Sequence, residues 1–215
     1  MAIRNLIKNQ SDPSLYTYAE LLKFGQELMY DNKEAKALRN IYTLDQDLRN
    51  KTKQLEQEFG VNSQEVKDHW ISIGRQDSLN LLKVKSILDK KGWLEPTEVS
   101  EEGNSAIFLV IQHADKETQE KYLPMMRSAV KEGKARGQDL ALLEDRLALA
   151  QGEKQIYGSQ IRRNADTGIY YVAPLRNPQQ VNERRNSVGL GPIENYVMIW
   201  DINWATEVDK LITQE

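Results

Sequence analysis

The sequence predicts a mainly α-helical protein, organised as a helical bundle-like domain with one small β-hairpin near its C-terminus. Apolar residues recur at helical spacing over the first two-thirds of the chain. Gly60, Gly92 and Gly152 follow three of these stretches, and glycine commonly ends a helix. After residue 152 the pattern changes to two short strand-like pieces around an Asp/Gly turn.

The individual elements follow from these signals in chain order. Residues 62–65 offer a helix cap with an acid three residues on, and the helix they open should run to Lys90. The other expected helices are residues 18–30, 34–59, 105–113, 116–131, 138–150 and 181–188, with a loop between Pro96 and Gly103. The run 107–111 is also short and β-branched enough for a strand, but helix is preferred. The hairpin strands are expected at residues 156–160 and 169–172.

Length and composition narrow the function classes. The 215 residues are expected to form a single domain, helical over 15–152, with the hairpin and C-terminal segment over 153–215. The absence of cysteine excludes disulfides, thiolate zinc sites and cysteine nucleophiles. A net charge of −3 argues against a nucleic-acid partner.

Neither a membrane span nor a signal peptide is expected from the sequence. No stretch approaches the ~20 apolar residues that a membrane span needs, and the first residues do not resemble a signal peptide. A cytoplasmic location is therefore expected, although a chain trimmed of its signal peptide would look the same.

An aspartate interrupts the apolar stripe of each of two consecutive helices. In the helix 34–59, steps of three and four connect Leu38, Ile41, Asp45, Leu48, Thr52, Leu55 and Phe59. Arg49 lies four residues after Asp45 and could pair with it. In the next helix the same spacing connects Val66, Trp70, Ile73, Asp77, Asn80, Val84 and Ile87. A stripe through Leu81 and Leu88 would move Asn80 to its flank but would keep Asp77.

The charged triplet Glu144, Asp145 and Arg146 lies in a helix that is otherwise apolar on all sides. Each of the three has only Leu or Ala three and four residues away. A buried charge costs several kcal/mol unless it is paired. The triplet therefore needs partners, and Asp45, Arg49, Asp77 and Asn80 are the candidates.

A second polar cluster follows the apolar run 106–111. Gln112 and His113 come directly after six apolar residues, and Asp115 is well placed to cap the next helix. Each inward polar residue has an ordinary structural interpretation, as a hydrogen-bonded group of the core. Their convergence from several stripes favours a functional polar pocket instead.

Several of these residues together resemble a known bacterial family. The segments are Gln112–Asp115, Leu143–Arg146, Gly152–Gln160, and Val181–Arg185 through Gly189-Leu190 to Pro192, with Asp45-Gln46, Arg49 and Gly92-Trp93 upstream. In this order they resemble DUF6624, a family of unknown function. The sequence has Ser159 where the family pattern has threonine, and its first proline after Trp93 comes later.

The resemblance implies no activity, but it adds site residues. It marks Gln155, Tyr157, Gly158 and Gln160, whose amides and phenol could orient a polar ligand. It also marks Arg184 and Arg185, which could hold a carboxylate or phosphate in bidentate fashion. Ion pairs with Glu183 or Glu194 are the structural alternative for these two arginines.

The first functional hypothesis is an enzyme that uses general acid–base catalysis, a hydrolase or transferase acting on a small polar substrate. His113 would carry the proton, Asp115, Glu144 or Asp145 would orient it, and Arg146 would stabilise developing negative charge. The sequence has no phosphate-binding glycine loop, no dinucleotide fingerprint and no metal-site spacing, so no cofactor or metal is expected.

The second hypothesis is a non-enzymatic protein that binds a ligand or another protein. The inward charges would then form a structural network. Aromatic residues near the hairpin and in the stretch from Tyr196 to Trp204 would form the interface.

Overall fold

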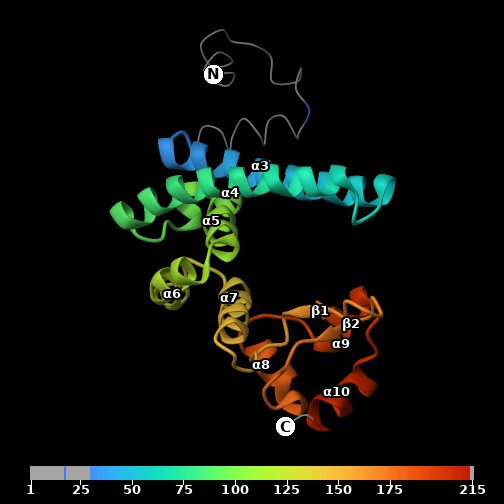
Figure 1. Cartoon of the computed structure of the whole chain (residues 1–215). Coiled ribbons are helices and arrows are strands. Elements are labelled where there is room, and N and C mark those ends of the chain that lie inside the picture. Colours follow the sequence, from blue (N-terminus) through green and yellow to red (C-terminus); the bar gives the residue numbers. More distant parts are fainter. Residues whose placement is uncertain (1–16, 18–29, 214–215) are drawn as a thin grey trace. The chain divides into compact units, whose positions relative to one another are not determined.

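The computed structural model of the chain describes residue 17 and residues 30–213 (Figure 1). Helices make up most of this part, and a two-stranded antiparallel sheet lies near the C-terminus. The prediction of a mainly α-helical fold with one small hairpin is therefore confirmed. The helix expected at residues 18–30 lies outside the described residues, apart from Tyr30.

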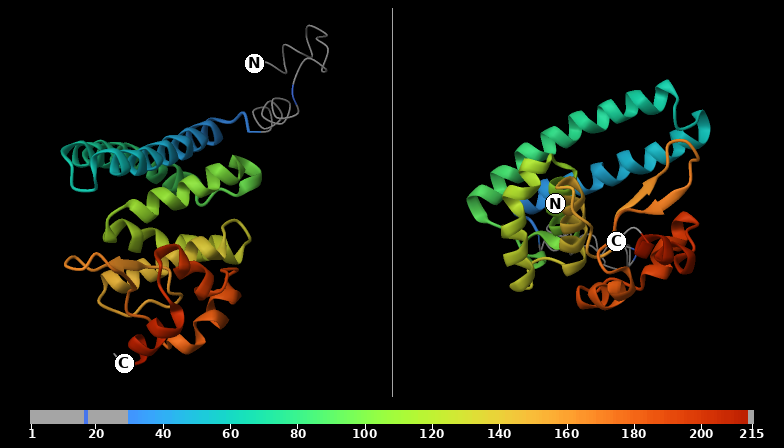
Figure 2. Two further views of the ribbon diagram at one scale, coloured as in Figure 1. Left: turned by 90° about the vertical axis from the view of Figure 1, so that its right-hand side faces the viewer. Right: turned by 60° about the horizontal axis from the view of Figure 1, so that its bottom comes forward.

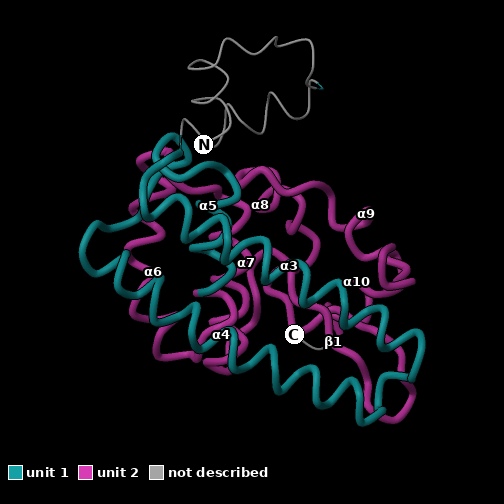
Figure 3. The backbone as a smooth tube through the Cα atoms, turned by 90° about the horizontal axis from the view of Figure 1, so that it is seen from above, with its two compact units in different colours: residues 1–110 teal, residues 111–215 magenta. Residues whose placement is uncertain are grey.

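The chain divides into two compact units, residues 1–110 and residues 111–215, which we call the N-terminal and C-terminal units (Figure 3). The change of character that the sequence shows at residue 152 falls inside the C-terminal unit. None of the helices described here combines the length and the apolar character that crossing a membrane requires.

Two long helices run side by side in the N-terminal unit, α3 (Lys33–Phe59) and α4 (Gln64–Lys91) (Figures 1 and 2). The Asn32 side chain caps α3 by accepting a hydrogen bond from the backbone N–H of Ala35. Ser63, the second residue of the expected 62–65 cap, does the same for α4 through the N–H of Val66. Gly60 and Gly92 end the two helices as expected.

The apolar stripes pack together along only part of this pair. Leu38, Ile41 and Asp45 are buried on α3, and Leu88 rather than Ile87 is fully buried on α4. Phe59 and Trp70, which the stripes place in the core, are 46% and 48% exposed. Both lie near the end where α3 leads into α4, whereas α5 packs against Leu38 near the other end of the pair, through Gly103.

The helix α5 (Pro96–His113) begins where the sequence predicts a loop. That prediction is wrong: residues 96–99 are already helical, and the chain bends at Ser100, whose φ is +71°. The Ser100 hydroxyl accepts a hydrogen bond from the backbone N–H of Gly103, which starts the second helical piece. The apolar run 107–111 is helical, as preferred.

The C-terminal unit begins with a helical hairpin, α6 (Lys116–Lys131) and α7 (Gly137–Ala150). Beyond it the elements are short: β1 (Ile161–Arg163), β2 (Tyr170–Val172), the 3-10 helix η2 (Pro178–Gln180), α8 (Val181–Ser187), α9 (Ile193–Val197), the 3-10 helix η3 (Met198–Trp200) and α10 (Trp204–Thr213). The predicted first strand is misplaced, because residues 156–160 form a loop and pairing starts at Ile161 with Val172. The short elements from β1 to α10 pack around a core of Val172, Leu175, Val181, Ile193, Val197, Ile202 and Leu211.

Candidate functional site

The carboxylate of Asp145 lies at the centre of the most extensive polar arrangement in the C-terminal unit. Its side chain leaves α7 fully buried and faces residues 155–160, which we call the 155–160 loop. One oxygen accepts the backbone N–H groups of Ile156 and Tyr157, at 2.6 and 2.9 Å. The other accepts the N–H of Ser159 at 2.9 Å. Both oxygens of Asp145 are therefore bonded to the backbone of this loop.

The carbonyl groups of the same residues are bonded on their other side. The Nε of Arg184 donates to the carbonyl of Ile156 at 2.7 Å, and Nη1 of Arg185 donates to that of Tyr157 at 2.8 Å. The Tyr196 hydroxyl donates to the carbonyl of Ser159 at 2.8 Å. The backbone of the loop thus lies between a carboxylate that accepts three of its N–H groups and donors that bind three of its carbonyls.

Gln155 closes the loop on itself. Its side chain is fully buried, and Oε1 accepts the backbone N–H of Gln160 at 2.8 Å. Its Nε2 donates to the carbonyls of Gln160 and Ala173, at 3.1 and 2.9 Å. Gly158 sits inside this turn with a φ of +71°, and a Cβ there would lie 2.7 Å from the Cδ1 of Ile193. The positive φ strongly favours glycine at that position, and a larger residue would also displace the end of the Ile193 side chain.

Burial dominates the electrostatics of this arrangement. It raises the pKa of Asp145, and the hydrogen bonds from the loop and from the Ser159 hydroxyl offset part of that effect. It lowers the pKa of Arg184 and of Arg185, although the negative charge of Asp145 acts in the opposite direction. Because the groups of opposite charge are separated by peptide groups, each depends on the loop for its compensation.

Glu144, the neighbour of Asp145, faces a different side of α7. Its carboxylate accepts a hydrogen bond from the Nε of Arg127 on α6 at 2.8 Å. The Tyr157 hydroxyl donates to its other oxygen at 3.4 Å. Burial and then the charge of Glu144 raise the pKa of the Tyr157 phenol. The carboxylate is 13% exposed, so this cluster reaches the solvent.

Arg146 faces the end of α5. With the Gln112 amide oriented to satisfy both side chains, its oxygen accepts from Nε and Nη2 of Arg146 at 2.9 and 3.3 Å. Burial lowers the pKa of this arginine, and no described carboxylate pairs with it. The suggested partners Asp45, Arg49, Asp77 and Asn80 bond within the N-terminal unit, and the described partners of the triplet are groups of the C-terminal unit instead. Glu144, Asp145 and Arg146 reach three different partners because consecutive helical residues point in directions about 100° apart.

Comparison with known protein families finds one match. The model of the family described as "Family of unknown function (DUF6624)" matches residues 33–209. The chain belongs to the DUF6624 family. No curated protein and no solved structure matches the chain. Membership of DUF6624 therefore implies no particular biochemical role.

A second charged cluster of this DUF6624 chain lies in the N-terminal unit. Arg49 donates to Asp45 at 3.0 Å and to Asp77 at 3.2 Å, so the two inward aspartates share one arginine between α3 and α4. Gln46 donates to the other oxygen of Asp45 at 2.9 Å. Asn80 is buried and accepts from the Gln76 amide. The predicted pair of Asp45 and Arg49 is thus present, with Asp77 added.

The two ends of the predicted 112–115 cluster differ in role. Asp115 caps α6 by accepting the backbone N–H of Thr118 at 2.8 Å, as expected. His113 is the last residue of α5, and its side chain is exposed. Within the described residues, no group of three or more His, Asp or Glu side chains is arranged to hold a metal ion.

Sequence reasoning overlooked several residues of these clusters. Arg127 lies on an exposed helix face, and nothing in its neighbourhood marks it as the partner of Glu144. The sequence places Tyr196 only in a possible interface, because its hydrogen bond to the loop spans 37 residues of sequence. The ion pairs suggested for Arg184 and Arg185 are replaced by bonds to backbone carbonyls.

Proposed function

We propose that this protein acts as a protein-interaction module whose interface lies on the C-terminal unit. The observation that carries the proposal is an apolar surface around the contact of Tyr170 with Trp200, whose ring centroids are 5.1 Å apart. Next to these rings in the chain, Ile169, Met198 and Ile199 are 67%, 69% and 73% exposed. We call these five residues the hairpin–η3 surface.

Large exposed apolar side chains that gather in one place commonly mark protein-binding surfaces. Tyrosine and tryptophan contribute strongly to binding because they bury much area with few rotatable bonds. Arg163 lies over the Tyr170 ring at 5.8 Å and adds a charged margin. The composition of the hairpin–η3 surface therefore matches that of a binding surface.

The polar network supports the same proposal. The 155–160 loop continues directly into β1, and its bond to Tyr196 fixes α9, which continues into η3. The buried charges thus hold both parts of the hairpin–η3 surface in place. A surface that is rigid before binding loses less conformational entropy when a partner binds. On this proposal Asp145, Gln155, Arg184 and Arg185 are structural residues.

Site-specific photo-crosslinking tests this proposal. A photoreactive phenylalanine analogue at Met198 should give a discrete crosslinked product in an extract of the producing cells, whereas the same analogue at the exposed Glu117 on α6 should not. Ile199→Asp should remove the product, because it places an unpaired carboxylate where the interface would exclude water. Equal products from both positions, or a product unaffected by Ile199→Asp, would contradict the proposed interface.

Acid–base catalysis on a small polar substrate is the second candidate, and the contact of Tyr157 with Glu144 supports it. A phenol with a raised pKa stays protonated and can donate a proton or hydrogen bond, while Glu144 can accept one. On this second proposal His113, Gln160 and Arg146 are still predicted to contact the substrate or take part in catalysis. The substrate would be a small polar molecule bound beside them.

Thermal-shift screening against a panel of small polar metabolites tests this candidate. A true ligand should raise the Tm of the wild type, and Tyr157→Phe should abolish the rise. The unliganded Tm should change little, because the hydrogen bond that this substitution removes is long, at 3.4 Å, and therefore weak. His113→Ala should behave in the same way. The catalytic candidate is contradicted if no compound raises the Tm, or if both variants respond as the wild type does.

A further inference from the structure

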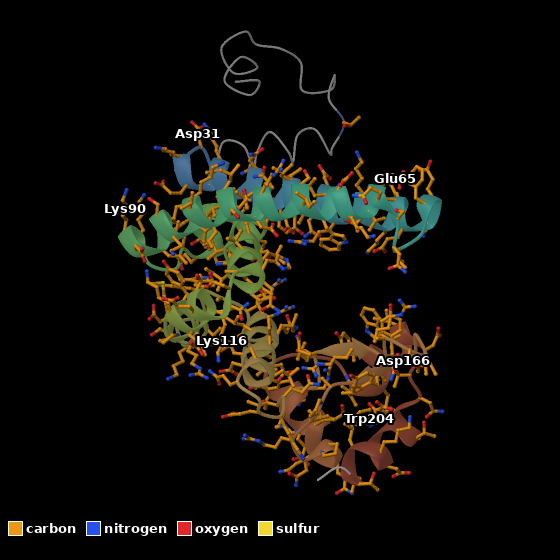
Figure 4. All side chains as sticks on the ribbon, in the orientation of Figure 1. Asp31, Glu65, Lys90, Lys116, Asp166 and Trp204 are labelled. Atoms are coloured by element: carbon orange, nitrogen blue, oxygen red, sulfur yellow. The ribbon has the colours of Figure 1, made fainter. Side chains whose placement is uncertain are left out.

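A groove runs between α3 and α4 on the N-terminal unit, far in sequence from the hairpin–η3 surface. We call it the α3–α4 groove; it has a volume of about 520 Å³. Its α3 wall includes Lys33, Ala37 and Asn40, and its α4 wall includes Leu82, Ile87 and Lys90. The lining extends from residue 33 to residue 40 on α3 and from residue 82 to residue 91 on α4, so the groove follows both helices for about two turns. Figure 4 shows Lys90 and Asp31 at the same end of the helix pair.

The floor of the groove is apolar and incompletely covered. Leu82 is 68% exposed, and Ile87 and Ala37 are half-buried beside it. A pair of packed helices has an apolar strip like this one along its groove. A third helix can cover the strip with the side chains at its positions i, i+3, i+4 and i+7. The shape of the groove therefore fits an amphipathic helix.

The rim of the groove is positively charged. Lys33, Lys83 and Lys90 line it and form no ion pair with a described residue. The fourth lysine of the rim, Lys91, pairs with the groove's own acid, Glu34, at 3.0 Å. Among the described residues, these three lysines therefore have no ion-pair partner within 4 Å, and they surround an apolar floor. Such a rim favours an occupant with negative charge on both sides of an apolar stripe.

We propose that the α3–α4 groove binds an acidic amphipathic helix of another protein. Leucine-like side chains of that helix would pack on Leu82, Ile87 and Ala37, while its carboxylates would meet Lys33, Lys83 and Lys90. This proposal is independent of the hairpin–η3 surface, because it uses none of the same residues. The protein would thus carry two binding surfaces, one on each unit.

A synthetic helix tests the proposal on the full chain. The probe is a fluorescein-labelled 16-residue peptide with leucine at positions 3, 7, 10 and 14, glutamate beside them, and alanine or glutamine elsewhere. Fluorescence anisotropy should show saturable binding that weakens with salt. Lys83→Glu with Lys90→Glu should weaken binding about tenfold or more. The matched charge control, Lys51→Glu with Lys53→Glu on exposed positions of α3, should bind like the wild type.

A second matched pair of variants tests the apolar floor of the groove. Leu82→Gln should weaken peptide binding, whereas Ile71→Gln on the same helix but outside the groove should not. Both side chains are more than half exposed, so neither change should unfold the protein. A peptide of the same composition with its leucines scattered around the helix should bind weakly.

Four results would overturn the proposal. The designed peptide fails to bind, or it binds no better than the scattered peptide. The groove variants bind like their controls. Phosphatidylglycerol vesicles bind in place of the peptide, which would assign the surface to a membrane. Finally, because the chain has no cysteine, Leu28→Cys with Leu82→Cys provides an unambiguous pair; a disulfide between them would show that the chain's own N-terminal segment occupies the groove.

Discussion

Replacing Asp145 with alanine should lower the free energy of unfolding of the C-terminal unit by about 3–5 kcal/mol. The substitution leaves the buried N–H groups of Ile156, Tyr157 and Ser159 without their acceptor. Each unsatisfied buried donor costs about 1–3 kcal/mol. It also removes the negative charge that offsets Arg184 and Arg185. Urea denaturation and hydrogen exchange of the three loop amides would measure the effect.

Two further variants distinguish the loss of the Asp145 carboxylate from the general effect of replacing an aspartate. Asp145→Asn keeps one acceptor oxygen but turns an amide donor toward the loop N–H groups, so its loss should be smaller but still clear. Asp166→Ala removes an exposed aspartate of the hairpin turn and should change stability by less than about 0.5 kcal/mol. Wild-type stability of Asp145→Ala would show that the loop does not depend on this carboxylate.

The carboxyl group of Asp145 also predicts how the free energy of unfolding changes with pH. Burial raises the pKa of Asp145 above that of the unfolded chain, so the folded protein binds this proton more tightly. Its contribution to stability is therefore largest below the unfolded pKa and is lost as the pH rises through the folded pKa. Asp145→Asn should remove this part of the pH dependence. Asp139, whose pKa burial also raises, should keep its own contribution in that variant.

Gln155→Leu should lower the free energy of unfolding by about 3 kcal/mol, although leucine is close to glutamine in volume. The fully buried amide bonds to both backbone groups of Gln160 and to the carbonyl of Ala173, and leucine can satisfy none of them. The loss should therefore come from unsatisfied polar groups rather than from a cavity.

Gln179 offers the matched control for this substitution. Its side chain is exposed, and Gln179→Leu should leave stability within about 0.5 kcal/mol of the wild type. Thermal unfolding of the two variants side by side would make the comparison. A Gln155→Leu variant as stable as Gln179→Leu would mean that the loop is held without this amide.

Local chemistry in the sequence predicted most of the helices. Gly60 and Gly92 end helices because they reach positive φ without strain, and Ser63 and Asp115 begin helices because their side chains accept orphan N–H groups. The prediction of a loop at residues 96–103 is wrong, because Pro96 and Gly103 do not interrupt the helix as the sequence suggests. A single serine at φ +71° absorbs the bend there, and the rest of the stretch stays helical.

The sequence also predicted that Asp45, Asp77 and Asp145 point inward, because helical periodicity assigns a residue to a face. It found the pairing of Asp45 with Arg49, since partners four residues apart lie on the same side of a helix. It missed the partners of Asp145, which lie 11 to 14 residues away in a loop without periodicity. No spacing rule connects such a loop to a helix.

The sequence by itself determined the helical class, the caps and the faces that carry buried charge, because these depend on neighbours within a few residues. The tertiary structure alone decided what the buried charges do. Folding brings the loop N–H groups to Asp145 and the loop carbonyls to Arg184 and Arg185, across up to 28 residues of sequence. A buried charge must find a partner, but packing decides which partner is within reach.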